Sequence, residues 1–332
     1  DERGDVVLGY SERHFGNYRA GRHNDDNLGT NLRARSSAPA AFDDWLNSEV
    51  GDTGSVTRSQ IVKFGLNLPN DQRVQLSYLE TDTDSNDAWG YIADDLQSTY
   101  YVRTSKNNLN AKNVALDYSY SPDNPLIDLK AKLYYVDNSN DQSTLTRRSS
   151  PGYSITYQTD TYGAQAQNTS TFALGGLSTL KANYGLEFFY DKVRPDSSQP
   201  VPKGSAVSAS PAASMTPEGD RALGSLFTRL DFDYDGWLNL NAGLRYDRYR
   251  LRGETGINTR TFVIGKTPQQ ISVPVAYDID NQEGRFSPTF GLSVKPGVEW
   301  LQLFASYGKG WRPPAVTETM ITGRPHGGGS ES

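Results

Sequence analysis

The stretch IVKFGLNLPNDQRVQLSY, residues 61–78, alternates apolar and polar side chains on both sides of a short polar turn. The apolar residues occupy every second position: Val62, Phe64, Leu66 and Leu68 before LPNDQ, and Val74, Leu76 and Tyr78 after it. A period of two is typical of a strand with one apolar face, and Pro, Asn and Asp between two such runs are typical of a turn. The stretch therefore predicts an antiparallel hairpin.

The same pattern occurs four more times along the chain. The turns fall at SPDNP (121–125), LGGLS (174–178), DYDG (233–236) and KPGVE (295–299), each between two alternating runs. The spacing of roughly 50–60 residues is a structural rhythm rather than a sequence repeat. With a first alternating segment at residues 6–19, the pattern predicts an all-β chain of about eleven antiparallel strands.

The connections are unequal at the two ends of these hairpins. The turns are short, whereas we expect long loops near 20–56, 81–111, 137–160, 191–221, 251–284 and 309–332. Short turns at one end and long loops at the other are typical of a transmembrane β-barrel of the outer membrane. The odd strand number predicts that residues 1–332 are the central portion of one barrel domain, about half of a 22-stranded barrel whose plug is not in this chain.

The polar face of the strands supports this prediction. Only 36% of the chain is hydrophobic, and the face opposite the Leu, Val, Phe and Tyr residues carries Lys, Arg, Asp, Glu, Asn and Gln. Such a face is too polar for the second half of a dry core but suits a water-filled lumen. Aromatic residues at both ends of the apolar runs, such as Trp237 and Tyr246, indicate two interfacial girdles. A soluble β-sandwich or a secreted β-helix also alternates and remains an alternative at this point.

Composition excludes several other classes. The chain has no cysteine, so it offers no disulfide framework and no thiolate metal site. Its net charge of -6 is scattered along the sequence, which argues against nucleic acid as a partner. No window approaches the roughly 20 apolar residues of a membrane helix. We find no nucleophile elbow, phosphate loop or zinc-protease motif and therefore expect no enzyme activity.

The segment FASYGKGWRPPAVTE, residues 304–318, resembles the arginine-proline box at the extracellular rim of TonB-dependent haem receptors. It is most similar to the haemophore-receptor (Has-type) branch, although Trp311 and Pro313 stand where Phe and Ala are commoner. The residues that carry the resemblance are Trp311, Arg312, Pro313, Pro314 and Glu318.

The resemblance implies a receptor in the outer membrane of a Gram-negative bacterium. Such a receptor takes haem from an extracellular haem carrier, a haemophore or haemoglobin, and is energised by TonB through a plug segment that has no counterpart here. Contacts with lipid and lipopolysaccharide are implied as well. Within the same architecture, a ferric-siderophore receptor is the nearest alternative, and a secreted soluble adhesin or glycan-binding protein is a more distant one.

The resemblance also implies a role for His326, which follows the box in TGRPHGGG. In the family, a histidine at this position is an axial ligand of the haem iron, and neutral imidazole is a common haem ligand. The alternative is an exposed loop histidine beside a glycine-rich run. Arg312 could bind haem propionates, but we expect it to pair with Glu318. His14 and His23 are expected to be exposed polar histidines, and neither is assigned as a second haem ligand.

Overall fold

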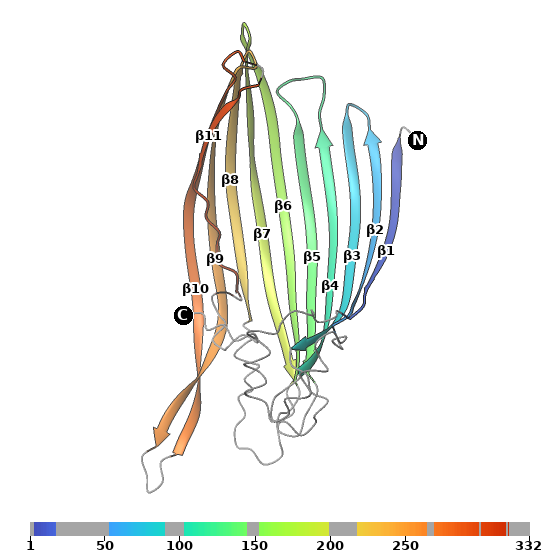
Figure 1. Cartoon of the computed structure of the whole chain (residues 1–332), viewed down its shortest axis with the longest axis vertical. Coiled ribbons are helices and arrows are strands. Elements are labelled where there is room, and N and C mark those ends of the chain that lie inside the picture. The colour runs from blue at the N-terminus through green and yellow to red at the C-terminus, as the bar shows by residue number, and fades with distance from the viewer. Residues whose placement is uncertain are drawn as a thin grey trace, which may run out of the picture.

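A single antiparallel sheet runs through the computed structural model, which describes residues 3–17, 53–89, 103–144, 153–198, 218–263, 269–298, 300–316 and 318. Within these ranges the sheet has eleven strands in chain order, and Figure 1 shows them side by side with the tight turns gathered at one end. The strands are β1 (Gly4–Phe15), β2 (Ser55–Leu68), β3 (Gln72–Trp89), β4 (Arg103–Tyr120), β5 (Leu129–Thr144), β6 (Tyr153–Gly175), β7 (Ser178–Ser198), β8 (Glu218–Tyr234), β9 (Leu238–Val263), β10 (Gln269–Val294) and β11 (Leu303–Gly308). The predicted all-β, eleven-stranded chain is confirmed.

The tight turns fall where the sequence predicts them. They join the strands at residues 69–71, 121–128, 176–177, 235–237 and 295–302. In the DYDG turn, Asp235 and Gly236 both have positive φ, 50° and 67°. Two successive positive φ values give a hairpin turn whose twist matches that of the flanking strands, and Asp-Gly is a favoured pair there. In the part of the chain described, no helix is long and apolar enough to cross a membrane.

One face of the sheet is a continuous apolar band. Neighbouring strands bring its residues into register, as in the row Val6, Phe64, Leu76, Leu116 and Leu133. These side chains are exposed: Leu8 keeps 73% of its surface accessible, Leu133 58% and Leu226 62%. An apolar surface of this extent is unfavourable in water but matches the hydrocarbon of a bilayer. We call it the lipid face and the opposite, concave side the inner face.

The predicted loops at 81–111, 137–160, 191–221 and 251–284 are too long, because the strands continue into all of them. The longest example is the β9–β10 pair, which runs out to Val263 and Gln269. Beyond the apolar band the outward side chains are mostly polar, so the pattern of the lipid face no longer marks the strands. On β10 the sequence still alternates at Ile271, Val273, Val275, Tyr277 and Ile279, and the predicted loop 251–284 does not take this signal into account. The ladder continues there through main-chain hydrogen bonds and polar cross-strand pairs, such as the hydroxyls of Thr57 and Thr83 at 3.1 Å.

Candidate functional site

After β11 the chain leaves the sheet and crosses the inner face of β8–β10. The main-chain N–H of Lys309 donates to the carbonyl of Pro288 at 3.0 Å, and the ring of Trp311 then lies 5.6 Å from that of Tyr249 on β9. The Arg285 guanidinium of β10 lies 5.8 Å from the Trp311 ring. We call residues 309–316 and Glu318 the rim strap. Its described residues line the inner wall, so the prediction that this segment is an external loop is wrong for them.

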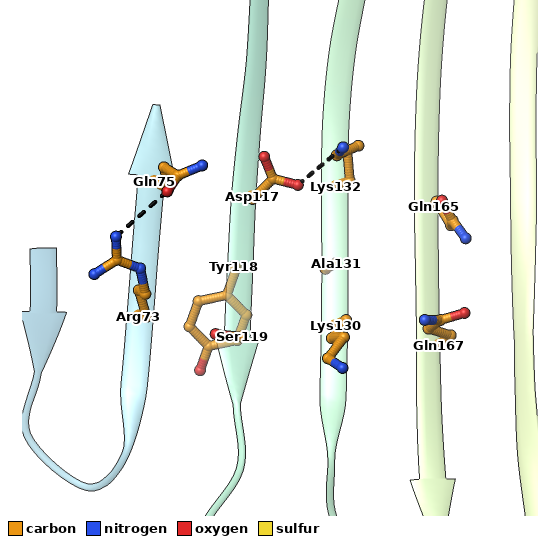
Figure 2. A pocket seen from close by; sticks show the side chains of 10 residues that line it. All are labelled: Arg73, Gln75, Asp117, Tyr118, Ser119, Lys130, Ala131, Lys132, Gln165 and Gln167. Carbon is orange, nitrogen blue, oxygen red and sulfur yellow. Dashed lines mark hydrogen bonds and ion pairs between the residues drawn. The ribbon is translucent and has the colours of Figure 1, made fainter. Parts of the chain in front are cut away.

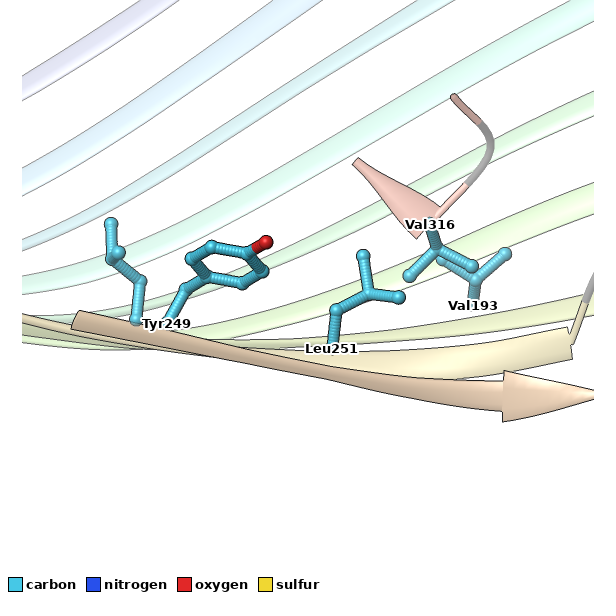
Figure 3. Packing of buried hydrophobic residues seen from close by; sticks show 5 residues of the cluster. Val193, Tyr249, Leu251 and Val316 are labelled. Carbon is cyan, nitrogen blue, oxygen red and sulfur yellow. The ribbon is translucent and has the colours of Figure 1, made fainter. Parts of the chain in front are cut away.

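The far end of the strap is held by hydrophobic packing. Val316 is only 2% exposed and packs with Val193, Leu223 and Leu251 on β7, β8 and β9. Figure 3 shows Val316 above Leu251 and Val193, on a short piece of chain separate from the sheet. Leu251 is fully buried by this contact. This cluster is the hydrophobic core of the inner face, and the strap covers it.

Two prolines lead the strap to that contact. Pro313 is buried and Pro314 is half-buried. Proline has no N–H to satisfy and holds φ near -65°, and it disfavours helix at the residue before it. The pair therefore keeps the chain extended along the wall. The carbonyl of Pro314 accepts a hydrogen bond from Nη1 of Arg221 on β8 at 3.2 Å.

Arg221 itself is fixed by a carboxylate of the wall. Its Nε and Nη2 donate to Oδ2 of Asp191 on β7 at 3.0 and 2.5 Å. The guanidinium carbon lies 5.2 Å from the ring centroid of Phe189. The Arg221 side chain is 16% exposed and that of Asp191 is 11% exposed. A charge buried to this degree needs its partner, so Arg221 is held in place before it binds the strap.

Arg312 and Glu318 close the strap on itself. Nη1 and Nη2 of Arg312 donate to the two carboxylate oxygens of Glu318 at 2.9 and 2.6 Å, as predicted. Glu318 Oε2 also accepts the main-chain N–H of Ala315 at 2.8 Å. The hydrogen bonds from Arg312, and secondarily from Ala315, lower the pKa of Glu318. The pair fixes the strap at its last described residue.

The rest of the inner wall is polar and internally paired. Below the strap, Arg245 binds Glu187 at 2.8 Å and Asp247 at 2.7 Å, and Asp247 also accepts the Ser225 hydroxyl at 2.6 Å. Asp247 is only 5% exposed, and its hydrogen bonds from Arg245 and Ser225 keep this buried carboxylate from being unpaired.

A second sector of the inner wall, on β3–β6, carries a polar concavity of about 320 Å³. Figure 2 shows the Asp117–Lys132 ion pair and the Arg73–Gln75 hydrogen bond there, with Gln165 and Gln167 on the neighbouring strand. An inner face so rich in charge and amide groups agrees with a hydrated lumen.

The structure brings five of the predicted site residues together and leaves the histidines apart. Trp311, Arg312, Pro313, Pro314 and Glu318 all belong to the rim strap. His326 and His23 lie outside the described residues. His14 lies on β1, at the opposite edge of the sheet from the strand that leads into the strap, and its Nε2 is 2.8 Å from Glu12 Oε1. His14 is therefore not near the strap.

Sequence reasoning missed the wall residues that receive the strap. Tyr249, Leu251 and Arg221 were not singled out, and all three fall at the edges of or inside stretches predicted as loops. By register, the apolar Val193, Leu223 and Leu251 lie on the inner face of their strands, not on the lipid face. This break in the alternation is a signal for the covered part of the wall, although Ile61, Leu79 and Phe227 show the same break elsewhere on the inner face.

Comparison with known proteins agrees with this architecture. Residues 55–331 match the family model described as TonB dependent receptor-like, beta-barrel. The hemophore receptor HasR of Serratia marcescens, solved in complex with its hemophore HasA and heme, is 39% identical, with a TM-score of 0.74 over 98% of this chain and 44% of HasR. The chain thus spans less than half of the length of HasR. A search of the curated proteins gives no match.

Two further receptors share the fold at low identity. The FrpB iron transporter from Neisseria meningitidis is 15% identical, with a TM-score of 0.55 over 92% of this chain and 42% of FrpB. The Ferric-Catecholate import receptor Fiu from E. coli is 12% identical, with a TM-score of 0.62 over 95% of this chain and 51% of Fiu. From the family match and the HasR identity together, the chain belongs to the TonB-dependent receptors of the outer membrane and forms part of their β-barrel.

Proposed function

We propose that this protein takes up haem from an extracellular haem carrier protein. The observation that carries the proposal is the 39% identity to HasR, a hemophore receptor solved with HasA and heme, across 98% of this chain. The metal and siderophore receptors of the same fold are only 12–15% identical. In this proposal the carrier is a haemophore or haemoglobin, and haem is the transported ligand rather than a resident cofactor.

The rim strap supports the proposal by fixing the start of the loop that contains His326. Glu318 is held by Arg312 and Ala315, and Val316 is buried in the inner wall. His326 follows Glu318 by eight residues, which reach at most about 27 Å when fully extended. The strap therefore anchors, on the inner wall, one end of the segment that contains the proposed haem ligand.

His326 supplies the chemistry that haem capture needs. A neutral imidazole binds haem iron directly and, unlike a thiolate, exchanges readily with a competing ligand. Gly327, Gly328 and Gly329 have no side chains that would keep the backbone away from a flat macrocycle. Arg312 is already bound to Glu318 through two nitrogens, which supports a structural role for it rather than propionate binding.

Transport requires no catalysis by this chain. The fold is that of receptors and transporters. We propose that the long loops dock the carrier, that His326 competes for the iron, and that TonB, acting on a plug segment, supplies the energy for inward passage. The soluble adhesin alternative is excluded by family membership.

Haem titration of the purified receptor tests the proposal. We expect a Soret shift in the wild type and a loss of affinity of at least about tenfold in His326→Ala, because an axial ligand contributes more than a single peripheral contact. His14→Ala is the matched control, since His14 is exposed and remote from the strap, and it should bind as the wild type does. If His326→Ala still gives a Soret shift and binds haem with the affinity of the wild type, His326 is not the haem ligand.

A ferric-siderophore receptor is the second candidate, because FrpB and Fiu share the fold. The two functions are distinguished by which compound binds the purified receptor, and quenching of its tryptophan fluorescence measures binding of a ferric catecholate. If the second candidate holds, a ferric catecholate quenches it at submicromolar concentration and haem causes no Soret shift. Haem binding without ferric catecholate binding supports the first.

A further inference from the structure

Strand β11 ends much earlier than its neighbour β10. It has six residues, Leu303–Gly308, and pairs only with Thr289–Val294 of the 26-residue β10. Figure 1 shows β10 continuing far beyond the end of β11. Close to this end, Phe290 and Tyr307 still lie side by side on the lipid face, with ring centroids 6.5 Å apart. The chain therefore leaves the sheet at the level of the apolar band.

The next position of this ladder joins Pro288 with Lys309. The main-chain N–H of Lys309 donates to the Pro288 carbonyl at 3.0 Å. In an antiparallel ladder a pair of this kind exchanges two hydrogen bonds, so the second would run from the N–H of residue 288 to the Lys309 carbonyl. Proline has no N–H. The pair is thus limited to one of its two hydrogen bonds, and β11 ends there.

Pro288 interrupts only the side of β10 that faces β11. In a ladder of this type the N–H and C=O of one residue point to the same neighbouring strand, and the Pro288 carbonyl points to β11. On the other side, the pairing with β9 continues through Pro288 and Leu244 without a shift of register. A proline within a sheet is confined to such an edge. Within the described residues, β10 is indeed an edge strand from Pro288 outwards.

A longer β11 and a docked rim strap exclude each other. Side chains alternate between the two faces of a strand, and Tyr307 of β11 is on the lipid face. A strand that continued in register would therefore place Trp311 on the lipid face as well. In the structure the Trp311 ring lies 5.6 Å from that of Tyr249, on the inner wall. Trp311 can make this contact only because the chain leaves the ladder before residue 311.

We propose that Pro288 is a positioning residue: because it lacks an N–H, it ends the β10–β11 ladder and directs the rim strap onto the inner wall. There the burial of Val316 and the hydrogen bond from Arg221 to the Pro314 carbonyl hold the strap. The consequence for haem capture rests on the proposed function, because the strap leads to His326. The effect of Pro288 on the strap does not depend on which ligand is transported.

Hydrogen-exchange mass spectrometry of the purified receptor in detergent tests this role with Pro288→Ala. The restored N–H can donate to the Lys309 carbonyl, which favours a longer β11 over the docked strap. One hydrogen bond gained in a ladder shifts such an equilibrium about fivefold. The main-chain amides of Ala315 and Val316, which belong to the docked strap, should therefore exchange about fivefold faster than in the wild type.

A second variant, Pro288→Ala/Lys309→Pro, moves the proline across the ladder. The pair is again limited to one hydrogen bond, now from the N–H of residue 288 to the carbonyl of residue 309, so exchange should return to within about twofold of the wild type. Pro69→Ala is the matched control, because it removes a proline from the β2–β3 turn and should leave the strap unchanged. Wild-type exchange in Pro288→Ala, or no rescue in the double variant, overturns the proposal.

Haem titration of the same variants separates this inference from the proposed function. If both hold, Pro288→Ala binds haem about fivefold more weakly and the double variant binds it as the wild type does. Faster exchange in Pro288→Ala, in a receptor whose wild type binds no haem, rejects the proposed function and supports the role of Pro288 in directing the strap. Pro288→Val, which also restores the N–H and suits a lipid-facing strand position, replaces Pro288→Ala if heat-modifiability on gels shows that the latter does not fold.

Discussion

The guanidinium of Arg312 binds the carboxylate of Glu318, six residues further along the strap, through both terminal nitrogens, at 2.9 and 2.6 Å. Both side chains remain largely accessible, so the pair adds little to global stability. Its effect is local: it holds Glu318 against Arg312 and the main-chain N–H of Ala315.

The first prediction concerns the pH dependence of that pair. Because the ion pair lowers the pKa of Glu318, its stabilising effect is complete above the ordinary glutamate value of about 4.3 and is lost as the pH falls through the lowered value. Protons compete with the iron for the imidazole of His326 in the wild type and in Glu318→Gln alike, so the measure is the ratio of the two haem affinities. This ratio should hold from pH 7 to about pH 5 and approach one below about pH 4. Glu318→Gln should show the weaker affinity already at pH 7; identical pH profiles would contradict a positioning role for the pair.

The second prediction concerns the packing of Val316. Val316→Ala deletes two methyl groups from a nearly fully buried site and should destabilise strap docking by about 1–2 kcal/mol. Hydrogen exchange of the main-chain amides of residues 309–316 should accelerate about five- to thirtyfold, while exchange in the strands is unchanged. Val298→Ala, at an exposed valine of the β10–β11 turn, is the control and should change neither. Unchanged exchange in the strap would show that Val316 does not hold it.

The third prediction concerns the Arg221–Asp191 pair beneath the strap. Arg221→Met leaves Asp191 buried without its cation and should lower the free energy of unfolding by about 3–5 kcal/mol. Adding Asp191→Leu should restore most of that loss, because both charges are then removed together. Urea unfolding in detergent measures both variants, and an additive double variant would show that the two side chains do not interact.

The fourth prediction tests which face meets lipid. Leu226→Arg places a charge in the middle of the apolar band and should cost about 2–4 kcal/mol on folding into lipid vesicles. Gln165→Arg, on the inner wall lining the polar concavity, should fold within about 0.5 kcal/mol of the wild type. Equal costs at both positions would contradict the assignment of the two faces.

Sequence reasoning succeeded where the environment differs between the two faces of a strand. From Val62 to Tyr78 the bilayer on one side and water on the other impose a strict alternation, and the hairpin and its turn follow from it. It failed at residues such as Glu254 and Asp278, which pair within long strands but were assigned to a loop. There the outward side chains are polar, so the pattern of the lipid face disappears while the hydrogen-bonded ladder continues.

The box residues show the same division. Their identity as a family motif was readable from Trp311 to Glu318, and so was the pairing of Arg312 with Glu318, because opposite charges six residues apart around two prolines have few other arrangements. The sequence did not show that the segment folds against the inner wall. Its direction depends on Tyr249, Leu251 and Arg221, whose contacts with the strap join residues 62–93 positions apart in sequence and form only after the strands of the wall have paired.

The sequence by itself therefore determined the all-β class, the strand rhythm, the sidedness of the sheet and the family, since each depends on local alternation or on a contiguous motif. Only the tertiary structure decided how far the strands extend and that the strap lies on the inner wall. These features depend on which strand neighbours which and in what register. Register is fixed by contacts between residues far apart in the chain, and no local pattern records it.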